Sequence, residues 1–157
     1  MVGLPAAGKS TLARQLASEL PAVRFGLDDW MIRLHALRFD DEEYAQRLPA
    51  CRDLILEMAG NVLSVGVDVV LDWNHWSPER RREARIWAGE RGAGFVVHYV
   101  TTPIEVAERQ ALAREDELSH RLSADGVHHA QSYFIAPEAT EGNTIVVHEH
   151  EPEDNSP

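Results

Sequence analysis

Lysine is almost absent from this 157-residue chain: Lys9 is the only one, and every other side chain with a fixed positive charge is arginine. Cysteine occurs once, at Cys51, which excludes an intrachain disulfide and fits the reducing environment of the cytosol. No apolar run approaches the ~20 residues that a membrane-spanning helix needs, and no signal-peptide pattern opens the sequence. We therefore expect a cytoplasmic protein without a membrane partner.

Positive charge is also in short supply. The net charge is −11 at pH 7, whereas sequence-independent nucleic-acid binding depends on neutralising phosphates with lysine and arginine. A small-molecule partner is therefore favoured over a nucleic acid. A local basic groove is not excluded, because Arg80, Arg81, Arg82 and Arg85 lie close together in the sequence. The composition leaves the oligomeric state open.

The single lysine lies in a phosphate-binding loop motif, the P-loop. The pattern G-x-x-x-x-G-K-[ST] is matched by Gly3, Leu4, Pro5, Ala6, Ala7, Gly8, Lys9 and Ser10, and Thr11 follows. In such a loop the lysine is a compact charge that reaches the β- and γ-phosphates, a task for which the planar fork of arginine is no equivalent. We predict that this loop binds ATP, with Ser10 on Mg²⁺ and Thr11 beside the α-phosphate.

The residues around the loop supply part of the context that the motif needs. Apolar residues at positions 12, 13, 16, 17 and 20 predict a helix, whose N-terminal N–H groups and dipole favour a phosphate. A P-loop normally follows a buried strand, yet only Met1 and Val2 precede Gly3. The strand is either cut to a stub or completed by residues upstream of Met1. We expect the second, because a central strand is hard to remove without exposing core.

The rest of the chain reads as alternating strands and helices. Strands are predicted at 22–26, 67–71, 94–100 and 144–148, and helices at 28–37, 41–48, 50–65, 78–91 and 103–115. This order predicts an α/β P-loop three-layer sandwich, with a parallel sheet of about five strands and helices on both faces. We expect one domain over residues 1–148 and an acidic, disordered tail at 149–157.

Acidic residues follow two of the predicted strands, and ligands of parallel sheets bind at such carboxyl ends. Asp28 and Asp29 come after the strand at 22–26. One of them is expected to accept the proton of an attacking hydroxyl and the other to cap the helix that follows, and we assign the proton to Asp28. Asp72 ends an apolar strand, which is typical of a Walker B carboxylate that holds Mg²⁺ directly or through water.

Aromatic and basic residues complete the predicted site. Trp73 and Trp76 form either a platform for an aromatic base or a sugar face, or part of the packing under the next helix, and both interpretations stay open. Arg109 and Arg114 follow the strand at 94–100. They either reach over the phosphates or pair with neighbouring glutamates on a solvated face, and Arg121 is a reserve candidate.

Taken together, these motifs resemble the P-loop kinase family grouped with phage-type polynucleotide kinase, especially its small bacterial ATP-binding members of unassigned substrate. The likeness covers nearly the whole chain and includes residues 134–142, which are similar to the family's F-x-x-P-x-x-x-E-G segment. The resemblance implies a general base at Asp28 and a lid over about 109–135. It also implies ATP contacts from Arg109, Arg114 and, near the adenine, Phe134 and Pro137.

Two departures from that family bear on the substrate. Polynucleotide kinases carry an arginine three residues after the base, where this chain has Met31, and their lid arginines are four residues apart rather than five. We therefore predict an ATP- and Mg²⁺-dependent kinase acting on a hydroxyl of a small molecule, whether antibiotic, sugar or nucleoside. The predicted substrate contacts are Asp29, Trp30, Trp73 and Asn74. The alternatives are a 5′-hydroxyl polynucleotide kinase and a nucleotide-dependent switch or ATPase without a phosphoryl acceptor.

Overall fold

Two pairs of parallel strands form the centre of the molecule. The computed structural model describes residues 1–113 and 124–149. Its strands are β1 (Ala22–Gly26), β2 (Asp68–Asp72), β3 (Val96–Thr101) and β4 (Thr144–Glu149). β1 pairs with β2 and β3 pairs with β4. The register sets Gly26 opposite Asp72, so the carboxyl ends of β1 and β2 are aligned.

The segment before the P-loop lies between the two pairs. Val2 donates to His98 O and accepts from Val100 N, each at 2.9 Å, which makes a parallel bridge to β3. On the other side, the Met1 nitrogen donates to Leu71 O of β2 at 3.1 Å. The predicted α/β fold with parallel strands is confirmed. Within the described residues, the strand expected before the P-loop consists of this short bridge.

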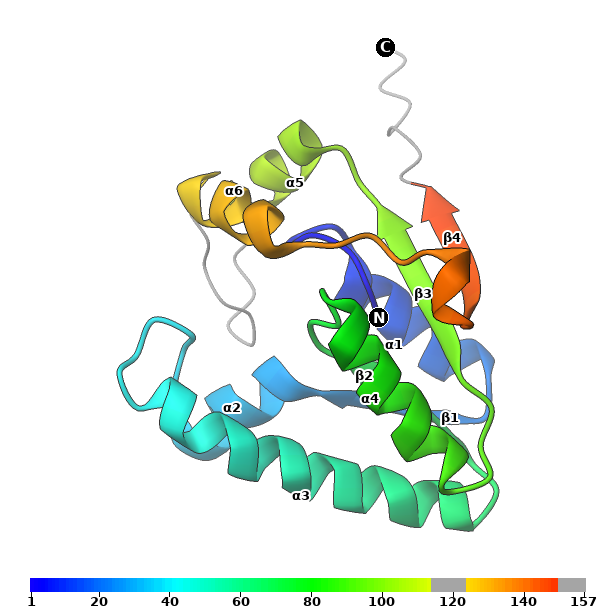
Figure 1. Cartoon of the computed structure of the whole chain (residues 1–157). Helices are drawn as coiled ribbons and strands as arrows, with labels where there is room; N and C mark the ends of the chain where they lie inside the picture. Colours follow the sequence, from blue (N-terminus) through cyan, green and yellow to red (C-terminus); the bar gives the residue numbers. More distant parts are fainter. Residues whose placement is uncertain (114–123, 150–157) are drawn as a thin grey trace.

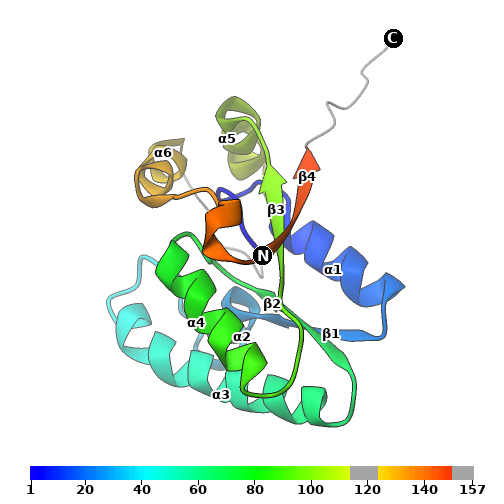
Figure 2. The same cartoon turned by 45° about the vertical axis from the view of Figure 1, so that its right-hand side comes forward.

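Helices cover both faces of the strands. They are α1 (Lys9–Glu19), α2 (Leu27–His35), α3 (Tyr44–Ser64), α4 (Pro78–Gly89), α5 (Ile104–Leu112), α6 (Ala124–Tyr133) and a 3₁₀ turn, η1 (Ala139–Glu141). Figures 1 and 2 show α1 and α4 on opposite faces, with α2 and α3 beside β1. α5 packs against α6. In the ranges that the structure describes, no helix combines the length and apolar character needed to cross a bilayer.

The course of α3 differs from the prediction. The sequence predicts separate helices at 41–48 and 50–65, but α3 runs through Pro49 without a break. Proline removes one backbone hydrogen bond at this point. The helix continues because Leu48 and Cys51, on either side of the proline, pack into the same core as β1, β2 and α2. Burial of one continuous apolar face outweighs the local preference of proline.

α6 has no counterpart among the predicted elements. Its sequence shows little apolar periodicity. Among its described side chains, only Val127 and Ala130 are buried. The helix is stabilised by tertiary packing, because Val127 joins Ala107 and Ala111 of α5 and Ala6 of the P-loop in one small cluster. α6 is thereby attached to the P-loop. The remainder of the predicted lid, residues 114–123, lies outside the described residues.

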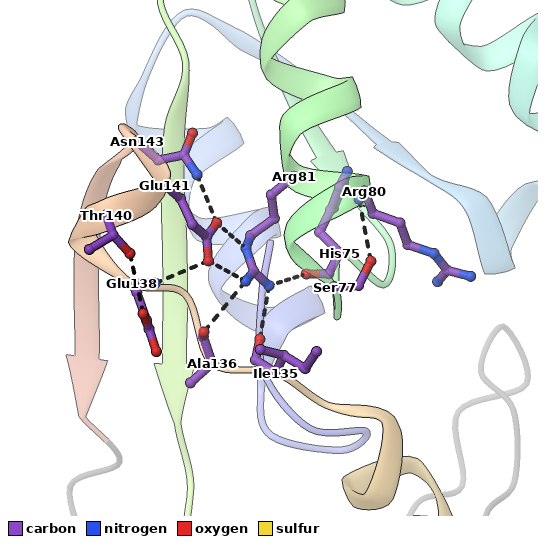
Figure 3. A network of polar contacts seen from close by, with 10 residues as sticks. All are labelled: His75, Ser77, Arg80, Arg81, Ile135, Ala136, Glu138, Thr140, Glu141 and Asn143. Carbon is purple, nitrogen blue, oxygen red and sulfur yellow. Dashed lines mark hydrogen bonds and ion pairs between the residues drawn. The ribbon is translucent and has the colours of Figure 1, made fainter.

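A buried arginine joins α4 to the segment before β4 (Figure 3). Arg81 has no exposed surface. Its guanidinium forms an ion pair with Glu141, with Nε to Oε2 at 2.7 Å and Nη2 to Oε1 at 2.5 Å. It also donates to the carbonyls of His75, Ile135 and Ala136. A single side chain therefore fixes the loop after β2 and the segment leading to β4.

We expect Glu141→Gln to lower the free energy of unfolding by about 3 kcal/mol, because it leaves the buried Arg81 charge without its carboxylate. Urea denaturation at neutral pH measures this. The exposed contact of Arg85 Nη1 with Gly142 O offers a control on the same segment, and Arg85→Gln should cost about 1 kcal/mol or less. Equal effects of the two substitutions would contradict the role given to the ion pair.

The effect of Glu141→Gln should also depend on pH. The hydrogen bond from Arg81, with smaller help from other donors, lowers the pKa of Glu141 below its ordinary value. The carboxylate thus contributes stability that is fully present above the ordinary glutamate pKa of about 4.3. This contribution is lost as the pH falls through the lowered pKa. The stability difference between the wild type and Glu141→Gln should therefore shrink only in acid.

Candidate active site

The P-loop has the backbone geometry of an anion-binding turn. Gly8 precedes α1 with φ 93°, a conformation that side chains other than glycine rarely adopt. At Gly3 a Cβ atom would lie 2.7 Å from Val100 O, so only glycine allows this approach to β3. The loop ends at Lys9, whose side chain is largely buried and whose Nζ donates to Leu4 O at 2.6 Å. The N-terminus of α1 follows directly, and the backbone N–H groups at such a helix start favour an anion.

Two side chains from neighbouring loops hold the P-loop in place. Trp76, after β2, donates from Nε1 to Gly3 O at 3.1 Å. Thr102, after β3, is buried and donates from Oγ1 to Ala7 O at 2.9 Å. Neither contact was predicted from the sequence. No local pattern could have revealed them, because each joins residues that are more than 70 positions apart in the chain.

Several of the predicted site residues line one cavity of about 390 Å³, which we call the P-loop cavity. Those it shares with the sequence prediction are Pro5, Ala6, Gly8, Lys9, Ser10, Asp28, Asp72, Trp73 and Asn74. They come from three separate segments: the P-loop, the end of β1 and the end of β2. The predicted meeting of strand carboxyl ends with the P-loop is therefore found in the structure.

Asp28 lines the P-loop cavity at the start of α2. The hydroxyl of Tyr44, at the start of α3, lies 3.4 Å from Asp28 Oδ1 and donates to it. Burial first, and then the Asp28 charge, raise the pKa of the Tyr44 phenol above its ordinary value. The phenol therefore remains a donor across the physiological range. The Tyr44 hydroxyl thus helps to hold Asp28, which still borders the cavity, as a proton acceptor must.

Asp29 occupies a different environment from its neighbour. Arg24 of β1 bridges two carboxylates, with Nη1 to Asp29 Oδ2 at 2.6 Å and Nη2 to Asp72 Oδ2 at 2.6 Å. Burial alone would lower the pKa of Arg24, but Asp29 and Asp72 outweigh burial and raise it. Arg24, for which the sequence predicted no role, thus fixes Asp72. Asp29, predicted to contact substrate, is not among the lining residues of the P-loop cavity.

The three predicted tryptophans divide between the cavity and the core. Trp73 and Trp76 line the P-loop cavity, whereas Trp30 packs on the main core and lies 6.3 Å from the Phe25 ring. Trp73 serves both interpretations, because it also packs against that core. Its ring stacks on His75 at 5.4 Å. Burial lowers the pKa of His75 to about 3, so this ring is a neutral support for Trp73 at physiological pH.

α6 and the segment before α3 supply cavity residues that were not predicted from the sequence. From α6 come His129 and Tyr133, whose rings lie 5.0 Å apart, and from the loop before α3 comes Phe39. With the tryptophans they give the cavity an aromatic wall. Arg80, near the start of α4, adds a positive charge. None of these could be assigned from sequence, because their common surface exists only in the folded chain.

The predicted lid and adenine contacts are not brought to this cavity. Arg109 is exposed on α5 and is absent from the cavity lining, and Arg114 and Arg121 lie outside the described residues. Pro137 belongs to the segment held by Arg81 and is likewise not a lining residue. The roles given to Arg109, Arg114 and Pro137 stay predictions.

A second, more open hollow of about 790 Å³ borders the P-loop. Ala6 and Gly8 line both spaces, so the two spaces adjoin at the P-loop. Thr11 and Gln15 of α1 and Gln110 of α5 line this hollow, which we call the α1 hollow. An elongated ligand crossing the P-loop would therefore have one end in the α1 hollow and the other in the P-loop cavity.

Comparison with known proteins identifies relatives of this arrangement. A family model described as "AAA domain" matches residues 1–137. No curated protein matches the chain. Solved structures do: the chain is 18% identical to a sugar kinase from Janibacter sp. HTCC2649, with a TM-score of 0.64 over 94% of this chain and 82% of that one.

Two further structures have the same fold at similar identity. Kti12 of Chaetomium thermophilum, solved in complex with ADP-AlF3, is 16% identical, with a TM-score of 0.64 over 98% of this chain and 89% of that one. A gluconokinase from Sinorhizobium meliloti 1021 is 17% identical, with a TM-score of 0.55 over 93% and 79% of the two chains. At such identities the likeness shows the fold alone.

Proposed function

This chain belongs to the AAA domain family whose model matches residues 1–137, and we propose that it is an ATP-dependent kinase that phosphorylates a hydroxyl group of a small molecule. One observation carries the proposal. Lys9 and Ser10 of the P-loop, Asp28 and Asp72 line a single cavity with space beyond them for an acceptor. Such a kinase needs at least a nucleotide-binding loop and a carboxylate that can deprotonate a hydroxyl.

The nucleotide is proposed to cross the P-loop from one space to the other. Its nucleoside would occupy the α1 hollow beside Thr11 and Gln15, and its terminal phosphate would enter the P-loop cavity. The backbone from Gly3 to Gly8 and the Lys9 ammonium would bind the phosphates. Arg109 and Arg114 remain candidates to reach the phosphates from the predicted lid.

The residues present also fit Mg²⁺. Ser10 and Asp72 offer oxygen ligands in the same cavity, and Mg²⁺ in such sites takes few protein ligands because phosphates and waters complete its shell. Accordingly, no group of three acidic, histidine or cysteine side chains forms a metal cage within residues 1–113 and 124–149. When bound, the ion neutralises charge on the transferred group. Arg24 would keep the Asp72 carboxylate oriented.

Asp28 is proposed to accept the proton of the acceptor hydroxyl. The hydrogen bond that Tyr44 donates orients the Asp28 carboxylate. Trp73 and Asn74, predicted as substrate contacts, lie in the same cavity and would bind the body of the acceptor. Asp29 and Trp30 would act behind this surface, through Arg24 and the core, rather than by contact.

A coupled assay of ADP formation tests the proposal. Wild-type protein is incubated with Mg·ATP alone and then with a pool of hydroxylated sugars, nucleosides and aminoglycosides. We expect slow ADP formation alone and a several-fold rise with the pool, since an acceptor completes the site. A rate that is unaffected by any acceptor would instead favour a nucleotide-dependent switch.

A polynucleotide kinase, the alternative, would bind its nucleic acid through a basic face formed by the arginines of α4. These do not form one basic face: Arg81 is buried in its ion pair, and Arg85 donates to Gly142 O. Only Arg80 lines the P-loop cavity. Transfer to a 5′-hydroxyl oligonucleotide that weakens steeply with added salt would favour this alternative, because each phosphate contact releases counterions.

A further inference from the structure

One positively charged side chain that lines the P-loop cavity has no role in the proposed phosphoryl transfer. Lys9, Ser10 and Asp72 are assigned to the nucleotide and its metal, and Asp28 to the acceptor hydroxyl. Among the described residues that line the cavity, Arg80 is then the only other one with a fixed charge. In a chain with a net charge of −11, an arginine that lines this cavity bears on the charge of the acceptor that binds there.

Arg80 is held at the cavity by the backbone. It lies in the first turn of α4, where Ser77 Oγ accepts from Arg80 N at 3.4 Å. Its Nη1 donates to Asn74 O at 3.2 Å, and Asn74 is itself a lining residue. Figure 3 shows Arg80 pointing away from the Arg81 network. One of five donors is therefore occupied, and the geometry of the side chain is already restricted.

No carboxylate neutralises Arg80 among the described residues. Glu83, one turn along α4, forms no ion pair with it, and Asp72 is paired with Arg24 instead. Arg80 also borders an adjoining cavity of about 280 Å³, where Arg52 and Glu83 are the other charged lining residues described. Arg52 pairs there with Asp53, with Nε to Oδ1 at 4.0 Å.

We propose that the acceptor of this kinase is an anion, whose carboxylate or phosphate is bound by Arg80 while its hydroxyl lies at Asp28. The guanidinium fork matches the two oxygens of such a group. Trp73, Trp76 and Tyr133 line the same cavity, and aromatic rings of this kind bind an apolar or aromatic body by stacking. The proposal rests on the proposed function for the place of the hydroxyl, whereas the anion subsite itself can be tested by binding.

Binding is measured by calorimetry on protein saturated with Mg²⁺ and a non-hydrolysable ATP analogue, so that the phosphate end of the cavity is filled. Two matched pairs of probes differ only in charge. Para-(hydroxymethyl)benzoate is compared with its uncharged amide, and thymidine 3′-monophosphate is compared with thymidine. The variants are Arg80→Gln, Arg80→Lys and the control Arg82→Gln, which alters an exposed arginine of α4 outside the cavity lining.

We expect at least one anion to bind about tenfold or more tightly than its neutral partner, as a charge-assisted contact implies. Arg80→Gln should abolish this preference, Arg80→Lys should retain part of it, and Arg82→Gln should leave it unchanged. Preference for the benzoate alone identifies a carboxylate, and preference for the nucleotide alone identifies a phosphate.

Three results would overturn the subsite: equal binding within both pairs, no binding of either anion, or a preference that survives Arg80→Gln. Failure of the proposed function looks different. In that case the anion preference depends on Arg80 as expected, yet labelled ATP transfers no phosphate to any hydroxyl compound. Conversely, transfer to uncharged acceptors that is indifferent to Arg80→Gln would retain the kinase and remove the anion subsite.

Discussion

Asp28→Asn is expected to lower the rate of phosphoryl transfer by about 10²–10⁴-fold, the usual contribution of a general base, while ATP binds as tightly as before. The asparagine keeps the size and the hydrogen bond from Tyr44 but cannot take the acceptor proton. Single-turnover transfer of the γ-phosphate measures the first effect, and calorimetric titration with Mg·ATP measures the second. A loss of both would indicate damage to the P-loop rather than removal of a base.

Asp29→Asn provides the matched control. It makes the same chemical change one residue along the chain, at a carboxylate that faces Arg24 and not the P-loop cavity. We expect transfer to stay within a few-fold of wild type, because the amide oxygen still accepts from Arg24. If Asp29→Asn instead abolishes transfer and Asp28→Asn does not, the base lies one position further along the chain.

Lys9→Ala is expected to reduce transfer by about 10²–10³-fold, the cost of losing one contact that stabilises charge in the transition state. Lys9→Arg should restore little, because a planar fork is a poor substitute for a compact ammonium in this loop. Arg33→Ala, at an exposed position of α2, controls for loss of a surface charge. Circular dichroism checks that each variant is folded. Unchanged activity of Lys9→Ala would remove the P-loop from the mechanism.

Local signals explain what the sequence predicted well. The strand at 22–26 has the bounds of β1, and Ser77 and Pro78 mark the start of α4, because strand pattern and helix caps are encoded by neighbouring residues. The P-loop motif likewise places Lys9 and Ser10 at one cavity with Asp28. Parallel strands bring their carboxyl ends together whatever the loops contain.

Contacts between distant residues explain what the sequence did not predict. Arg24 is an unremarkable strand arginine until the fold places it between Asp29 and Asp72. α6 has a weak apolar pattern and depends on packing against α5. Asp29 and Trp30 were predicted to face the substrate on proximity in sequence alone. Because successive helix positions point in different directions, Asp28 borders the cavity whereas Asp29 and Trp30 do not line it.

The destination of the γ-phosphate tests the central claim most directly. Labelled ATP and Mg²⁺ are incubated with the protein, a 5′-hydroxyl oligonucleotide and a pool of small hydroxyl compounds that includes hydroxy acids. Chromatography then locates the label. We predict label on a small molecule, and none there with Asp28→Asn. Label on the oligonucleotide, or only in free phosphate, would contradict the proposal of a small-molecule kinase.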